Sequence, residues 1–136
     1  MKLIARFDDL PLSLYHLQPE NGFYKITGAD PQLTFDISSL SLSGREAGLL
    51  RFDFTCVNKR AESQIQVFWW GNDDKGPSEL YSIRFTAENG TLIVPLDATP
   101  LWLALNRIKG IRINLDNATA CSSIKVNNVC LYQRSF

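Results

Sequence analysis

Residues 49–57 read LLRFDFTCV, and apolar and polar side chains alternate along the whole stretch. Successive side chains of an extended chain point to opposite faces, so Arg51, Asp53 and Thr55 share one face. The other face is apolar and consists of Leu50, Phe52, Phe54 and Cys56. The stretch therefore predicts a strand with one face on a core and the other in water.

The segment from Gln64 to Gly71 predicts a second strand with two unlike faces. Ile65, Val67 and Trp69 share the face that is expected to be buried. The opposite face carries Gln64, Gln66, Phe68 and Trp70. Because this second face mixes amides with large aromatic rings, it is not an ordinary solvent-facing surface.

Turn residues separate further short runs with strand character. The turn at residues 28–31 lies between two alternating runs and predicts a hairpin or a corner. The Asn-Gly pair at 89–90 favours a hairpin between residues 81–86 and 91–96. A break in the alternation at 127–128 predicts a bulge in a strand near the C-terminus.

One segment, residues 100–108, has helical spacing. Thr99 can cap its start, Pro100 suits the first turn, and Gly110 can close it. Its expected apolar stripe consists of Leu101, Leu105 and Ile108. The segment predicts one short helix in a chain that otherwise consists of strands.

The fold class follows from length and strand spacing. With 136 residues the chain is long enough for one hydrophobic core and too short for two ordinary domains, so residues 1–136 are expected to form a single domain. Its turns suit about eight to ten short strands, which is typical of a sandwich or barrel. We therefore predict an all-β fold, a two-sheet antiparallel β-sandwich or jelly roll with one short helix near residues 100–108.

Charge and hydropathy narrow the partners and the location. The chain has 14 basic and 14 acidic side chains, and the basic ones are scattered, so no nucleic acid is expected as a partner. No apolar run approaches the roughly 20 residues that span a bilayer, so no membrane span is expected. Residues 1–9 meet charge before a signal-type apolar core can form, which predicts a cytoplasmic protein.

The three cysteines, Cys56, Cys121 and Cys130, cannot all pair with one another, and none has a metal-binding spacing. Our preferred interpretation is that they are buried free thiols in a reducing compartment. A single disulfide, joining Cys121 to Cys130 or either of them to Cys56, is the alternative. No cofactor-binding motif occurs, so no cofactor is expected.

Five stretches carry a resemblance to a known family. They are VFWW at 67–70, SELYSIRF at 78–85, VPLD at 94–97, IKGIRINLDN at 108–117 and IKVNNV at 124–129. Together they resemble the galactose-binding-like jelly roll of carbohydrate-binding modules and of accessory domains in bacterial polysaccharide glycosyltransferases. The family element Ile-x-x-Ile-Arg-Ile-Asp-Pro is altered here, with Asn114 in place of the acid and residues 115–117 in place of the proline turn. The resemblance implies a jelly roll that handles glycans.

Sugars are bound by aromatic rings that stack on their C–H faces, while amides and charged groups bond their hydroxyls. If the two strands at 49–57 and 64–71 are neighbours, their non-core faces combine into one such set. Its members are Trp70, Gln64, Gln66 and Arg51. The alternative is that a loop covers Trp70 and Phe68.

Three further side chains are candidates for binding a ligand. Trp102 lies on the predicted helix, half a turn from the apolar stripe, and the alternative is that it packs as a lid on the edge of the sandwich. Arg84 and Arg112 lie in the middle of strands, where they can bind a ligand hydroxyl or carboxylate. The alternative for both arginines is a stem packed on the sheet with its head in water.

Few side chains are suited to catalysis. His16 is the single histidine and stands in no metal-binding or general-base pattern. Asp73, Asp74 and Glu79 are expected to be solvated, although loop acids can bind calcium or act as a carboxylate pair. No nucleophile or phosphate-binding motif occurs, so we expect no catalytic residues.

These observations favour a non-catalytic carbohydrate-binding or accessory module, with a saccharide or another protein as its partner. A structural or assembly protein, with exposed aromatic rings buried in a homo-oligomer or another protein contact, is the first alternative. A small hydrolase or isomerase on a β scaffold is the second.

Overall fold

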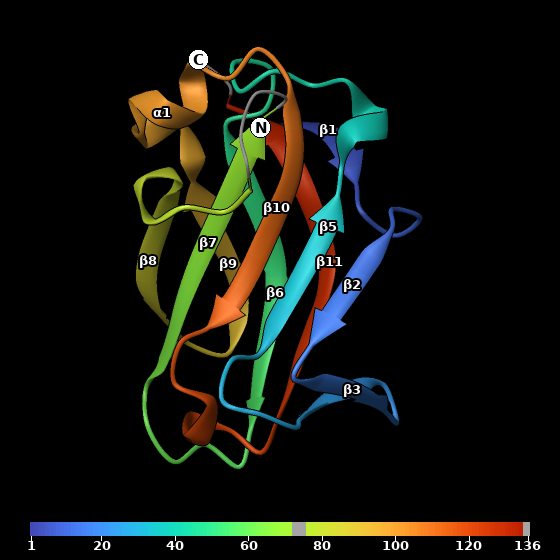
Figure 1. Ribbon diagram of the computed structural model, residues 1–136, viewed down its shortest axis with the longest axis vertical. Coiled ribbons are helices and arrows are strands. Elements are labelled where there is room, and N and C mark those ends of the chain that lie inside the picture. Colours follow the sequence, from blue (N-terminus) through green and yellow to red (C-terminus); the bar gives the residue numbers. More distant parts are fainter. Residues whose placement is uncertain (72–75, 135–136) are drawn as a thin grey trace.

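The computed structural model describes residues 1–71 and 76–134. Its strands form two antiparallel sheets that face each other (Figure 1). Sheet A contains, in order, β3 (Leu17–Glu20), β4 (Phe23–Ile26), β11 (Ser123–Gln133), β6 (Leu49–Val57) and β9 (Gly90–Pro95), and β1 (Lys2–Arg6) also pairs with β11. Sheet B contains, in order, β2 (Leu12–Tyr15), β5 (Gln32–Asp36), β10 (Ile108–Leu115), β7 (Ser63–Gly71) and β8 (Ser82–Ala87).

From β4 to β11 the chain crosses between the sheets at every connection except the one from β7 to β8, which are neighbours in sheet B. Four of these strands give the order β4-β11-β6-β9 in sheet A, and the other four give β5-β10-β7-β8 in sheet B. Two four-stranded antiparallel sheets joined by such crossings form a jelly roll. The prediction of an all-β, two-sheet sandwich with one short helix is confirmed.

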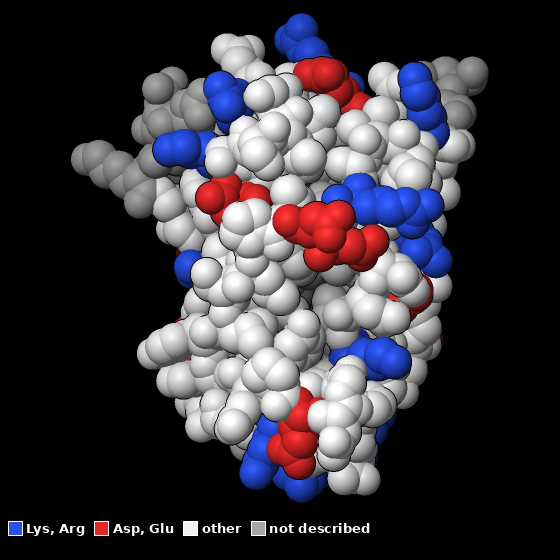
Figure 2. All heavy atoms as spheres, turned by 90° about the vertical axis from the view of Figure 1, so that its right-hand side faces the viewer, with Lys and Arg blue, Asp and Glu red and all other residues white. Residues whose placement is uncertain are grey.

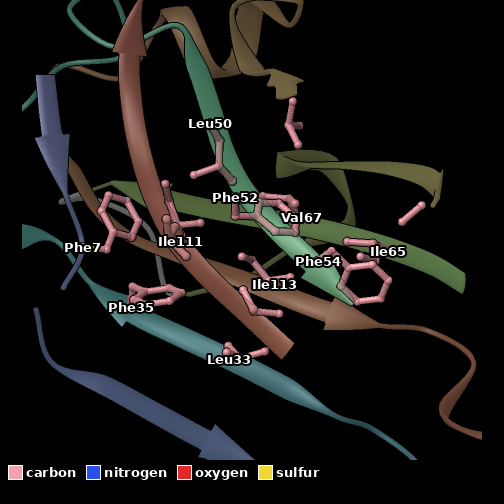
Figure 3. Packing of buried hydrophobic residues seen from close by; sticks show 14 of the residues in the cluster. Phe7, Leu33, Phe35, Leu50, Phe52, Phe54, Ile65, Val67, Ile111 and Ile113 are labelled. Carbon is pink, nitrogen blue, oxygen red and sulfur yellow. The ribbon is translucent and has the colours of Figure 1, made fainter. Parts of the chain in front are cut away.

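The core lies between the sheets and is built by the alternation that residues 49–57 predict. Phe52 and Phe54 point from β6 toward Val67 and Ile111 of sheet B (Figure 3), and all four are at most 1% exposed. On the other side of β6, Arg51, Asp53, Thr55 and Val57 are partly exposed, and Leu49 at the start of the strand is buried. The period-two pattern therefore places each side chain of this strand on its expected face.

The two predicted turns both join strands of different sheets. The turn at residues 28–31 forms the corner between β4 and β5, one of the two expected arrangements. The hairpin expected at Asn89-Gly90 is wrong, because β8 belongs to sheet B and β9 to sheet A. Gly90 has a φ of +128°, and Asn89 Oδ1 accepts a 2.8 Å hydrogen bond from the backbone N–H of Cys56. The Asn-Gly pair therefore lies in a connection that crosses between the two sheets, and not in the turn of a β-hairpin.

The helix begins as predicted but ends after one turn. Thr99 Oγ1 accepts a 3.2 Å hydrogen bond from the N–H of Trp102, and α1 spans Pro100–Leu103. The expected stripe is wrong, since Leu101 is 40% exposed and Ile108 begins β10. Trp102 is fully buried instead and meets Trp69 edge to face at 5.8 Å between ring centroids. A helix of one turn is too short to form an apolar stripe along its length. Its largest apolar side chain, Trp102, points into the core instead.

The preferred interpretation of the cysteines is corrected. Cys56 and Cys121 form a disulfide that joins residues 65 positions apart. Cys56 lies near the end of β6, and the next residue, Val57, pairs with Ser123 at the start of β11. This pairing brings Cys121, two residues before Ser123, close to Cys56. Cys130 is a buried free thiol. Sequence spacing could not select this pair, because strand pairing brings the two cysteines together.

The predicted bulge near the C-terminus is present in β11. Its pairing with β6 shifts between Asn127 and Cys130, and Asn128 has a positive φ of 53°. Asn128 Nδ2 donates a 2.7 Å hydrogen bond to Asp53 on the outer side of β6. The bulge is therefore held by a side chain of the neighbouring strand. Within the described ranges, no helix has the length and apolar character that crossing a membrane requires.

Candidate functional site

The side of sheet B that points away from the core forms a regular grid of side chains, because register fixes which residues stand side by side. The central strand β10 pairs with β5 on one side and with β7 on the other. The resulting rows are Asp36, Gly110 and Trp70, then Thr34, Arg112 and Phe68, then Gln32, Asn114 and Gln66. We call this surface the outer face of sheet B.

Trp70 lies across the backbone of Gly110 on this face. A Cβ placed on Gly110 would stand 2.7 Å from Trp70 Cη2 and closer still to two other atoms of the indole. Real Cβ atoms do not approach other atoms so closely, so the ring takes the space that a side chain at 110 would fill. Trp70 is only half-buried there, whereas the other two tryptophans, Trp69 and Trp102, are fully buried.

Two hollows meet beside Trp70, and we call them together the sheet-B groove. The first has a volume of about 360 Å³, and its lining includes Trp70, Asp36, Ser38, Lys109, Pro11, Ser13 and Thr34. The second has a volume of about 450 Å³, and its lining includes Tyr15, Leu14, Gln32, Arg112, Ser13 and Thr34. They share Ser13 and Thr34, so the groove crosses the sheet from β7 to the edge strand β2.

Asp36 is the acidic side chain of the first hollow. Its carboxylate accepts a 2.6 Å hydrogen bond from the hydroxyl of Ser38 and a 3.0 Å bond from the N–H of the same residue. The hydrogen bond from the Ser38 hydroxyl lowers the pKa of Asp36 below its usual range, and the hydrogen bond from the Ser38 N–H and the positive charge of Lys109 lower it further. Asp36 is therefore an oriented, ionised acceptor.

Arg112 lines the second hollow and is bonded to Thr34, which lines both. Its Nε donates a 2.9 Å hydrogen bond to Thr34 Oγ1, and its guanidinium carbon lies 5.9 Å from the centroid of the Trp70 ring. Burial lowers the pKa of Arg112, against the field of Asp30, but a guanidinium keeps its charge in proteins. Among the described residues, no acceptor binds the two terminal nitrogens of Arg112.

The other half of the face, toward β8, is a closed polar network. Gln66 is 3% exposed, and its amide nitrogen donates to Glu79 at 2.8 Å and to Ser82 at 3.0 Å. Arg84 donates to Gln66 at 2.7 Å and to Asp116 at 2.8 Å. These side chains satisfy one another, so their polar atoms are already occupied.

Four of the six side chains expected to bind a ligand, Trp70, Gln64, Gln66 and Arg84, lie on the outer face of sheet B, but of these four the described lining of the groove includes Trp70 alone. Gln64, like the other two polar members, has a partner on the face, since its amide nitrogen donates 3.0 Å to Thr86. Arg51 does not join them. It lies on sheet A and pairs with Asp53 at 3.5 Å, because β6 and β7 belong to opposite sheets.

Trp102, the sixth candidate, is not on a surface. Its ring is fully buried, and its Nε1 donates a 2.8 Å hydrogen bond to the carbonyl of Ala47. A tryptophan buried with its N–H paired belongs to the core. The expectation that Trp102 lines a ligand site therefore gives way to its alternative, a lid packed on the sandwich.

The groove residues that sequence reasoning missed come mainly from β5 and from the start of β10. Asp36, Lys109 and Thr34 lie beside Trp70 only because β5 and β10 pair across more than 70 residues of chain. Alternation in residues 32–36 shows that Thr34 and Asp36 share a face, but not which sheet that face belongs to.

Two other polar side chains lie on or near this face. Asn114 is 8% exposed, and its Oδ1 has no hydrogen-bond partner among the described residues. His16 stacks on Tyr15 at 3.9 Å, and its Nδ1 accepts a 3.0 Å hydrogen bond from the N–H of Asp30. Asp73 and Asp74 lie outside the described residues.

The charges near the groove are of both signs. Figure 2 views the molecule from the side of β1, β2 and β3, where Lys and Arg side chains are interspersed with Asp and Glu. No extended region of one sign covers the side in view. A ligand that approaches this edge of the sandwich meets local charges of both signs and not a broad field.

Comparison with known proteins adds no relative. No protein-family model matches the chain, and no curated protein matches it. The fold and the face define a jelly-roll sandwich whose sheet B carries, on its outer face, a groove lined by Trp70 and Tyr15. The argument for function therefore rests on the chemistry of that groove.

Proposed function

We propose that the protein is a non-catalytic module that binds a saccharide in the sheet-B groove. The observation that carries this proposal is the half-buried indole of Trp70, which lies over Gly110 and lines a hollow together with Asp36 and Lys109. An aromatic ring of this size beside charged groups is hard to justify by packing alone.

The groove offers the two kinds of contact that a sugar needs. The indole supplies a flat apolar surface for the C–H face of a sugar ring. Asp36 can accept hydrogen bonds from hydroxyls, and Lys109, Ser13 and Thr34 can bond the others from the walls of the groove. Because the groove runs on to Tyr15, it has room for more than one sugar unit.

The resemblance of residues 67–131 to galactose-binding-like jelly rolls supports the same proposal and extends it. In that family such modules accompany bacterial polysaccharide glycosyltransferases, and we include an accessory role of this kind in the proposal. The strand order is compatible with it. Fold alone is weak support for a ligand, so the groove carries the argument.

The proposed absence of catalysis rests on the number of carboxyl groups in the described lining of the groove. Glycoside hydrolysis ordinarily needs two carboxyl groups, one of which must hold a proton near neutral pH. Asp36 is the acidic residue in the described lining of the groove, and its lowered pKa keeps it ionised. A carboxylate in this state orients a hydroxyl but does not act as a general acid.

Titration with soluble polysaccharides and their oligomers, followed by calorimetry, tests the proposal. We expect binding by the wild-type protein and a loss of about tenfold or more in affinity for Trp70→Ala, because stacking on the ring is lost. Lys125→Gln is the control, since Lys125 lies on the outer side of sheet A. Silence across a broad panel, or unchanged affinity of Trp70→Ala, would overturn the proposal.

A separate apolar patch supports the second function, a protein–protein contact. Leu80 is 74% exposed, and Leu101 and Leu103 are 40% and 37% exposed. They come from the short helix η2 (Glu79–Tyr81) and from α1, which lie in contact. Light scattering at micromolar concentration tests whether this patch mediates self-association. A dimer that Leu80→Glu dissociates would support self-association, and a monomeric wild-type protein would contradict it.

A further inference from the structure

We infer that the saccharide of the sheet-B groove is acidic, and that a carboxylate on one of its sugar units pairs with the guanidinium of Arg112. This inference rests on the proposed function and names the class of ligand. It is carried by the juxtaposition of an unused guanidinium fork with the one tryptophan that is not fully buried.

The two arginines on the outer face of sheet B differ in how their donors are used. Arg84 has its Nε on Asp116 and one terminal nitrogen on Gln66, and Glu79 lies 3.8 Å from that nitrogen. Toward the described residues, Arg112 donates only through its Nε, and a neutral hydroxyl is the acceptor. Its terminal nitrogens are therefore available to a ligand, and this pair of parallel N–H donors matches a carboxylate.

The position of Arg112 fits a charged group carried by a stacked sugar. The guanidinium lies over the Trp70 ring, 5.9 Å from its centroid, and Arg112 also lines the second hollow. A sugar unit beside the indole, or the next unit along the groove, brings a carboxylate within reach of the fork. Thr34 fixes the other end of the guanidinium, so few rotamers are lost on binding.

The groove carries charges of both signs. Lys109 and Asp36 line the first hollow, Arg112 lines the second, and the field of Asp30 reaches Arg112. Asp36 accepts two hydrogen bonds from Ser38, and the Asp30 carboxylate accepts a 2.6 Å bond from Gln32. Among the described residues, no carboxylate forms an ion pair with Arg112, so an anion is favoured by the open fork of this side chain and not by the net charge of the groove. A carboxylate carries one charge and suits one fork, whereas a phosphate group carries about −1.5 to −2 and calls for more cations.

The test compares oligomers of galacturonate, glucuronate and mannuronate with their carboxyl-reduced counterparts, which keep the chain and lose the charge. We expect the wild-type protein to bind at least one acidic oligomer about tenfold or more tightly than its neutral counterpart. The acidic ligand should also lose affinity as salt is raised, while the neutral one should not.

Arg112→Gln should remove the preference for the acidic oligomer, whereas Lys125→Gln, on the outer side of sheet A, should keep both the preference and the affinity for the neutral oligomer. Arg112→Lys, which keeps the charge without the fork, should retain part of it. Thermal unfolding of each variant verifies that it is folded. A preference that survives in folded Arg112→Gln, or equal binding of acidic and neutral oligomers, overturns the inference while the proposed function stands. No binding by any saccharide overturns both.

Discussion

The indole of Trp70 occupies the space above Gly110, on the neighbouring strand, where any other residue would place its Cβ. Trp70 and Gly110 are paired directly in the antiparallel register, so a glycine in β10 is what allows the ring to lie across the sheet. A glycine inside a strand often marks such a close approach. The position of the ring therefore depends on two residues that are 40 positions apart in the sequence.

Gly110→Ala should displace the ring. We expect the change to lower the free energy of unfolding by about 1–3 kcal/mol, as overpacking does, and to weaken saccharide binding. Chemical denaturation and calorimetry measure the two effects. In a Trp70→Ala background the same change should cost little, because the ring that clashes is gone. Equal costs in the two backgrounds would show that Gly110 does not hold Trp70.

The Cys56–Cys121 disulfide predicts a specific thiol count. A thiol reagent should find no reactive group in the native protein, because Cys130 is buried and burial raises the pKa of its thiol. In denaturant without reductant it should find one thiol, and after reduction three. Three thiols before reduction would show that the bridge is absent.

The same bridge should contribute to stability. Closing a loop of this length, 65 positions, stabilises a chain by about 4 kcal/mol in the loop-entropy description. Cys56→Ser combined with Cys121→Ser should lose much of that in chemical denaturation, and reductant should then have no further effect. Disulfides persist in oxidising compartments, so the thiol count of protein taken directly from its source also tests the predicted cytoplasmic location.

The salt bridge between Asp97 and Arg134 predicts a pH dependence. Arg134 donates to Asp97 at 2.8 Å, and this hydrogen bond holds the pKa of Asp97 below its usual value of 3.8. A carboxyl with a lowered folded pKa stabilises the protein above its unfolded pKa, and that stabilisation is lost as pH falls through the folded value. Asp97→Asn should therefore be less stable than wild type at pH 7 and pH 5, and the difference should shrink below about pH 4. A difference that stays constant down to pH 3 would contradict this.

Asn114 should be replaceable at a gain in stability. Its Oδ1 is buried without a partner among the described residues, and a buried acceptor without a partner costs about 1–3 kcal/mol. Asn114→Val has a suitable shape for a strand and should raise the free energy of unfolding by about 1 kcal/mol. A destabilised variant would show that the amide is bonded. Lower saccharide affinity with unchanged stability would assign the amide to the ligand.

The faces of individual strands could be predicted from the sequence, but the partners of those strands could not. Alternation predicts that Phe52 lies on the core face of its strand and that Trp70 lies on the non-core face of its own strand. Both positions agree with the structure. It cannot say that β6 and β7, consecutive in the chain, belong to different sheets. Alternation therefore predicts Arg51 on the face of Trp70, although Arg51 lies on the other side of the sandwich.

Local signals failed where long-range contacts decide the structure. The Asn-Gly pair at 89–90 has the backbone freedom of a hairpin, but the chain uses it to cross between sheets. Trp102 lies outside the expected stripe of the helix, yet it is buried. Its ring packs on Trp69, and its Nε1 donates a hydrogen bond to the carbonyl of Ala47. The disulfide likewise depends on the pairing of β6 with β11. The positions of three cysteines in the sequence do not show which two of them this pairing brings together.

Quenching of tryptophan fluorescence by acrylamide tests the central claim most directly. Trp69 and Trp102 are fully buried, so the quenchable emission should come from Trp70 and should be missing in Trp70→Phe. A saccharide that calorimetry shows to be bound should protect that emission, because a sugar stacked on the indole excludes the quencher. Quenching that remains unchanged when the saccharide is bound, or that persists in Trp70→Phe, would contradict the account.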